Sequence, residues 1–116
     1  MNERHALQDV RINVLRAEEV GAWHCILRLA LELGRPGAPL RSVRLGCFDY
    51  VTADGRTGSF SPALMAQVFE LPPELVASTV DTLLELGLLA RDGATLWIED
   101  AADWFVPLAE HAPLRN

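Results

Sequence analysis

The order of proline and glycine between residues 60 and 98 constrains the fold of this chain more than any other feature. Ser61 is a good cap for a helix, and Pro62 suits the first helical position because its missing N–H has no partner there. The pattern predicts a short helix over residues 62–69.

A second helix is expected directly afterwards. Pro72 and Pro73 can open a helix but cannot lie inside one, and Gly87 is typical of the residue that ends one. Apolar side chains recur inside it with the spacing of one buried face, at Val76, Val80, Leu83 and Leu84. Two helices joined by so few residues indicate a helix-turn-helix.

The segment LLARDGATLWI follows the second helix. Two apolar stretches flank Asp92 and Gly93, a dipeptide favoured in tight hairpin turns, so a hairpin is predicted in the position of a wing. Asp100 can then cap a short last helix, with Asp103 at the capping-box position. The apolar face of this last helix is expected to consist of Trp104, Phe105 and Leu108.

The amino-terminal half carries one strong helical signal, over residues 17–33. Glu18 and Glu19 lie in its first turn, where carboxylates complement the helix dipole, and Gly34 and Pro36 end it. Its apolar face is expected to consist of Trp23, Ile26, Leu27, Ala30, Leu31 and Leu33.

Between residues 35 and 60, prolines and glycines interrupt every helical pattern. The sequence there predicts only a short strand within 43–51 and a turn at Asp54 and Gly55.

Length and composition favour one soluble domain. The chain has 116 residues, of which 50% are apolar and 22% charged, so we expect one domain over residues 1–116 with its core between about 12 and 105. The expected fold class is α+β, mainly α: a winged helix with a three-helix core, a hairpin wing and a short last helix. The amino terminus lacks the apolar segment of a signal peptide, and we expect a cytoplasmic protein.

Catalytic signatures are missing from the sequence. Ser59 and Ser61 lack the G-x-S-x-G frame, and no glycine-rich phosphate-binding loop occurs. Cys25 and Cys47 have no paired Cys/His spacing, which predicts reduced thiols. His5, His24 and His111 are separated from one another and from the cysteines. We therefore expect no enzyme activity, no cofactor, no metal, no small-molecule substrate and no membrane partner.

From about residue 17 to residue 104, the chain resembles the amino-terminal winged-helix domain of bacterial and phage replication-initiation proteins of the DnaD and replisome-organiser type. Four stretches and Trp104 carry the resemblance: AWHCILRLALELG, DGRTGSFSPALMAQVF, VDTLLELGLL and RDGATLWIED. The resemblance implies a phage, prophage or plasmid origin and a role in replication or transcription regulation. Proteins of this type usually carry further sequence after the domain, whereas the sequence here ends at Asn116. The chain is therefore expected to act as a standalone unit.

Charge distribution departs from the pattern of a DNA-reading helix-turn-helix. Residues 1–60 contain eight arginines and seven acidic residues, whereas residues 61–116 contain two arginines and nine acidic residues. DNA-reading helices are usually basic or amide-rich. The exposed stripe predicted for the helix after Pro72 is Glu74, Ser78, Asp81 and Glu85. Insertion of this helix into a DNA groove is therefore disfavoured.

Two hypotheses of function follow. In the first, the domain docks on protein within a nucleoprotein assembly and also contacts DNA, for which the candidate residues, with Arg35 nearby, are Arg41, Arg44, Arg56 and Arg91. In the alternative, it is an acidic module, or a phage-type inhibitor of a host protein, that binds no DNA. Both predict a protein partner or self-association, for example as a dimer. The candidate protein-binding residues are those of the exposed stripe, Glu74, Ser78, Asp81 and Glu85, together with Trp97, Trp104, Phe105 and Leu108.

Overall fold

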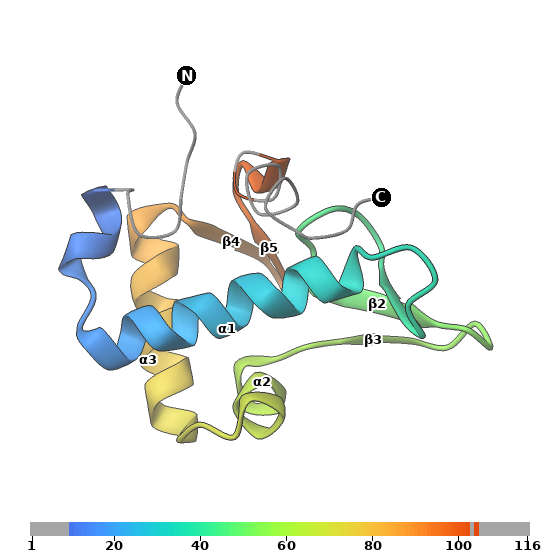
Figure 1. Cartoon of the computed structure of the whole chain (residues 1–116), viewed down its shortest axis with the longest axis horizontal. Coiled ribbons are helices and arrows are strands. Elements are labelled where there is room, and N and C mark those ends of the chain that lie inside the picture. Colours follow the sequence, from blue (N-terminus) through green and yellow to red (C-terminus); the bar gives the residue numbers. More distant parts are fainter. Residues whose placement is uncertain (1–9, 103, 105–116) are drawn as a thin grey trace, which may run out of the picture.

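Helices and short strands alternate along the part of the chain that the structure describes, residues 10–102 and 104 of a computed structural model (Figure 1). The helices are the 3-10 helix η1 (Val10–Val14), α1 (Ala17–Leu33), α2 (Pro62–Phe69) and α3 (Pro73–Leu86). The strands are β1 (Leu40–Ser42), β2 (Asp49–Thr52), β3 (Thr57–Ser59), β4 (Leu89–Asp92) and β5 (Thr95–Ile98). They form an antiparallel sheet in the order β1-β2-β3 and the hairpin β4-β5. The α+β class is confirmed.

Helix α1 is the central element of the fold and has the predicted bounds. It packs against α2 and α3, and Figure 1 shows it lying across α3, with β2 and β3 extending beyond its other end. At its start the backbone N–H of Arg16 donates to Glu19 Oε1 at 2.9 Å. At its end the backbone N–H of Gly34 donates to the carbonyl oxygen of Ala30 at 3.1 Å. Leu31 is only half-buried, so the buried face is narrower than predicted there.

Helices α2 and α3 also have the predicted bounds. The Ser61 hydroxyl accepts a hydrogen bond from the backbone N–H of Leu64 at 3.1 Å, as expected of a cap. Gly87 ends α3 with a φ of 79°, in the left-handed region that favours glycine. Val76, Val80 and Leu83 are buried, whereas Leu84 is half-buried.

The hairpin β4-β5 follows α3 as predicted, but its turn lies one residue later. Asp92 pairs with Thr95, so the two-residue loop is Gly93 and Ala94 rather than Asp92 and Gly93. Gly93 has a φ of 63°, and a positive φ at the first loop position is what the tight hairpin turns require. Asp92 therefore belongs to the strand.

The prediction for residues 35–60 was incomplete, because this region forms three strands instead of one. We call the sheet β1-β2-β3 the arm. Strands β1 and β3 have three residues each, LRS and TGS, and so little sequence contains no readable alternation. The Tyr50 ring packs on Phe60, with centroids 5.0 Å apart. A Cβ atom at Gly58 would lie 2.5 Å from Tyr50 Oη, so glycine leaves room for that ring.

Residues 46–48 connect the arm to the hairpin. The backbone N–H of Phe48 donates to Leu96 O at 3.0 Å, and the N–H of Ile98 donates to Gly46 O at 2.9 Å. Cys47 and Trp97 form an antiparallel bridge between these two bonds. The segment thus runs along the free edge of β5.

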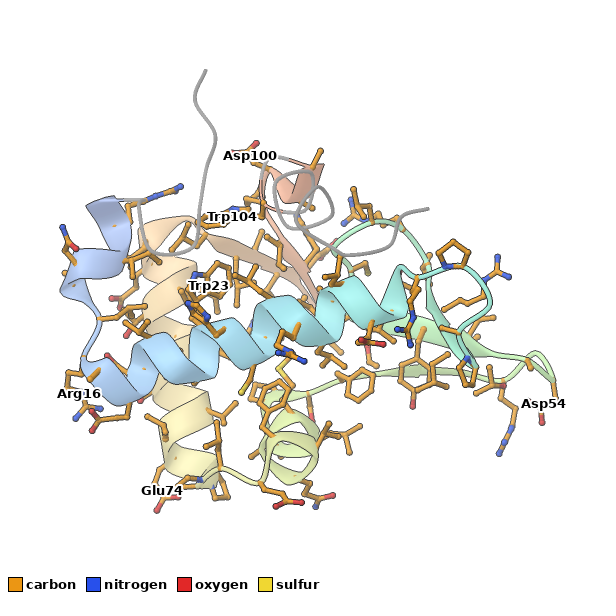
Figure 2. All side chains as sticks on the ribbon, in the orientation of Figure 1. Arg16, Trp23, Asp54, Glu74, Asp100 and Trp104 are labelled. Atoms are coloured by element: carbon orange, nitrogen blue, oxygen red, sulfur yellow. The ribbon has the colours of Figure 1, made fainter. Side chains whose placement is uncertain are left out.

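One hydrophobic core extends from Ile12 to Trp104. Trp23 and Trp104 are 0% and 1% exposed and meet edge to face, with ring centroids 5.4 Å apart (Figure 2). Ala101, Ala102 and Trp104 have helical backbone. Asp100 has a φ of 55°, unlike the extended backbone of an ordinary helix cap. Asp103, Phe105 and Leu108 lie outside the described residues.

Candidate interaction surfaces

The outer side of α3 is acidic, as the sequence predicted. Glu74, Asp81 and Glu85 are exposed, and none of them takes part in an ion pair of the described residues. We call these three carboxylates the acidic face. Ser78 lies between them but is half-buried, and its hydroxyl donates to the carbonyl oxygen of Leu75 at 3.2 Å. Ser78 is therefore engaged by its own helix.

The acidic face has no basic residue beside it in sequence. The chain has no arginine, lysine or histidine between Thr57 and Ala90, a stretch that includes all of α2 and α3. Glu74 lies in the first turn of α3, where a carboxylate complements the helix dipole. Glu85 lies near the other end, where a carboxylate opposes it. Helix stability therefore explains Glu74 but not Glu85.

The structure does not gather the four candidate DNA-binding arginines on one element. Arg41 lies on β1, Arg44 between β1 and β2, Arg56 in the β2-β3 turn, and Arg91 on β4. Figure 2 shows Asp54, beside Arg56, at the end of the arm, far along the molecule from Glu74.

Intramolecular contacts occupy several of these arginines. Arg56 Nε lies 3.2 Å from Asp54 Oδ2, and Arg35 pairs with Glu32 at 2.7 Å. The Thr52 hydroxyl, and then Arg56, hold the pKa of the Asp54 carboxyl below its usual value. The Arg44 guanidinium stacks over the Trp97 ring, 4.6 Å from its centroid.

Arg41 and Arg91 are different. Both are exposed, and within residues 10–102 and 104 neither takes part in an ion pair. They are the two of the four candidate arginines for which the described residues provide neither an ion pair nor a ring contact.

Of the two predicted aromatic docking residues that the structure describes, Trp97 is on the surface and Trp104 is not. Trp97 is half-buried, and its Nε1 donates to Glu99 Oε2 at 3.3 Å. Trp104 lies in the core against Trp23, so a partner cannot reach it in the folded domain. The proposal that Trp104 docks on a partner is corrected accordingly. Phe105 and Leu108 are outside the described residues.

Sequence reasoning missed two surface features. Three aliphatic side chains on the arm and the loop beside it, Val43, Leu45 and Val51, are exposed to 65%, 52% and 36%. An open groove of about 600 Å³ also lies between the starts of α1 and α3. Both depend on how distant segments meet, and no local pattern signals them.

The described residues give no sign of other chemistry. Among them, no three His, Cys, Asp or Glu side chains are grouped as metal ligands would be, and no helix has the length and apolar character to cross a membrane. Cys25 is half-buried and Cys47 buried, both as free thiols.

Comparison with known proteins adds no assignment. No family model, curated protein or solved structure matches this chain. The resemblance to replication proteins stays a prediction from the sequence.

Proposed function

We propose that this protein is a non-enzymatic docking module of winged-helix type, and that the acidic face of α3 binds a basic surface on a partner protein. The observation that carries the proposal is the state of the carboxylates of Asp81 and Glu85. Both are exposed, and no ion pair of the described residues neutralises them. Glu85 also opposes the dipole of its own helix.

Such a face suits a protein partner better than DNA. Phosphate contacts supply most of the nonspecific affinity for DNA. If α3 entered a DNA groove, its three carboxylates would repel the phosphates on either side. A complementary basic protein surface would instead gain orientation and a faster association rate from them.

Two features support the winged-helix assignment. The order α2, α3, β4, β5 is that of a helix-turn-helix followed by a hairpin. Residues 46–48, which precede α2, also lie along β5, so the hairpin is extended by a third segment.

The kind of assembly in which the protein docks is proposed from the sequence resemblance alone. That resemblance favours a phage-, prophage- or plasmid-type assembly for replication or transcription regulation. A phage-type inhibitor that occupies the DNA site of a host protein is the alternative, and the acidic face serves both.

Capture from lysate tests the proposal. The immobilised protein is compared with an Asp81→Asn/Glu85→Gln variant after nuclease treatment of a lysate from the native host, and captured proteins are quantified by mass spectrometry. Glu32→Gln/Asp92→Asn, which removes two exposed charges elsewhere, is the matched control. We expect a basic protein to be lost with the α3 variant and retained with the control. Equal capture by all three proteins contradicts the proposal.

A second candidate function, contact with DNA, is favoured by the exposed charges of Arg41 and Arg91. If they bind phosphates, affinity for duplex DNA falls steeply with added salt, and Arg41→Gln/Arg91→Gln makes that dependence shallower. Arg28→Gln, on the exposed side of α1, is the control. An unchanged salt dependence in the double variant removes this candidate.

A further inference from the structure

The groove between the first turns of α1 and α3 combines an apolar surface with charged rims. Its lining residues are Arg16, Glu18, Pro72, Glu74, Leu75 and Ser78. Pro72 and Leu75 supply the apolar part. The carboxylates of Glu18 and Glu74 come from different helices. The groove therefore offers an apolar floor with an acidic group on each of two elements.

Negative charge prevails around this groove. The Arg16 guanidinium lies 3.5 Å from the Glu19 carboxylate and 3.9 Å from that of Glu18, so one cation is shared by two anions. Glu74 adds a third carboxylate, and it has no ion pair within the described part of the chain. The two helix amino termini offset about one negative charge in total. A net charge of about −1 remains.

An arginine side chain matches both properties of the groove. Its aliphatic stem can cover the apolar floor while its charged head stays at the wet rim. Its planar guanidinium can donate to carboxylates on two sides, which the compact ammonium group of lysine does less well. An acidic or phosphorylated ligand would meet Glu18 and Glu74 at the entrance, and like charges there are repulsive.

We infer that this groove binds an arginine side chain of the basic partner protein. The inference rests on the proposed function and adds to it the kind of residue that anchors the partner. The anchor sits at the start of α3, and Asp81 and Glu85 extend the same acidic face beyond it. Partner recognition thus divides into an arginine pocket and a more general electrostatic surface.

Titration with short peptides tests the inference. The probe is an acetylated and amidated pentapeptide with one central arginine, added to ¹⁵N-labelled protein and followed by NMR. Lysine and citrulline versions are the matched probes, because citrulline keeps the shape and loses the charge. We expect saturable shifts of the amides of Glu18, Leu75 and Ser78, weaker binding of the lysine peptide, and no saturable shifts with citrulline.

Variants locate the binding. Glu18→Gln and Glu74→Gln, each from one helix, should lower affinity for the arginine peptide by about two- to fivefold, the range expected for losing one exposed ion pair. Glu85→Gln, farther along the acidic face, should leave it unchanged. Both groove carboxylates are exposed, so the variants are expected to fold, and their NMR spectra verify this.

Three results overturn the inference: equal shifts with citrulline, no saturable shift at any soluble peptide concentration, or the same affinity in Glu18→Gln and Glu74→Gln. Its failure is distinct from failure of the proposed function. If capture of the partner still depends on Asp81 and Glu85, the acidic face docks without an arginine anchor in the groove.

Discussion

The acidic face of α3 and the arm differ in how their charged side chains are used. On the arm and beside it, Arg56 pairs with Asp54 and Arg44 stacks on Trp97. On α3, the described structure provides no ion-pair partner for Asp81 or Glu85. Arg56 and Arg44 thus contact residues of their own molecule, whereas we propose that the α3 carboxylates serve an external partner.

The comparison requires that α3 has two separable faces, and the largest expected effect tests this. Leu83 is 0% exposed on the inner face, so Leu83→Ala should destabilise the domain by about 2–5 kcal/mol through lost burial and a cavity. Asp81→Ala, on the outer face, should change stability by less than about 0.5 kcal/mol. Chemical denaturation measures both. Similar losses in the two variants would mean that the acidic face contributes to folding.

The arm depends on one carboxylate that the fold does use. Asp49 accepts hydrogen bonds from the hydroxyls of Ser59 on β3 and Thr95 on β5, the latter at 2.8 Å. Asp49→Ala should cost about 1–3 kcal/mol, because the bonds to a charged group are lost. In this variant, amide hydrogen exchange should accelerate more in β2 and β3 than in α3. Uniform acceleration over the whole chain would contradict a local role.

Glu19 offers a pH test of the same contrast. The backbone N–H of Arg16 donates to its carboxylate, and this bond holds the pKa of Glu19 below 4.5, with the Arg16 guanidinium adding to the effect while burial opposes it. Because the folded pKa is lowered, its stabilisation is present above pH 4.5 and is lost as pH falls through the folded pKa. Glu19→Gln should be less stable than the unaltered protein at pH 7 by about 0.5–2 kcal/mol. Its free energy of unfolding should also fall less as the pH is lowered from 5 through the folded pKa of Glu19. Parallel curves for the two proteins would contradict this.

Glu85 should behave in the opposite way, with the smallest effect. Glu85→Arg replaces a carboxylate that opposes the α3 dipole by a cation that complements it, which should raise stability by about 0.3–1 kcal/mol while it weakens partner capture. Thermal unfolding and the capture assay report the two changes separately. A loss of stability would show that Glu85 has a structural role.

Much of the fold could be predicted because its signals are local. Helix ends are marked by residues with their own capping or backbone preferences: Ser61 and Pro62 start α2, Pro73 starts α3, and Gly87 ends it. Helices α1, α2 and α3 accordingly have the predicted bounds. The acidic face was predicted for the same reason, since side chains on a helix of known bounds have a fixed period.

The arm and the groove could not be predicted because they depend on contacts between distant residues. Strands β1 and β3 are stabilised by pairing with β2 rather than by their own composition. The groove exists only because α1 and α3 start side by side, and Glu18 and Glu74 are far apart in sequence. Trp104 was assigned in part to docking because aromatic residues are enriched in interfaces and a short segment cannot bury two adjacent aromatics beneath itself, whereas the structure places Trp104 against Trp23.

Zero-length cross-linking tests the central claim most directly. A carbodiimide joins carboxylates to amines that touch them, and the captured complex can be treated and mapped by mass spectrometry. The account predicts cross-links from Asp81 and Glu85 to lysines of the partner, and none from Glu32 or Glu99. Cross-links confined to Glu32 or Glu99, with α3 unmodified, would show that the partner docks elsewhere.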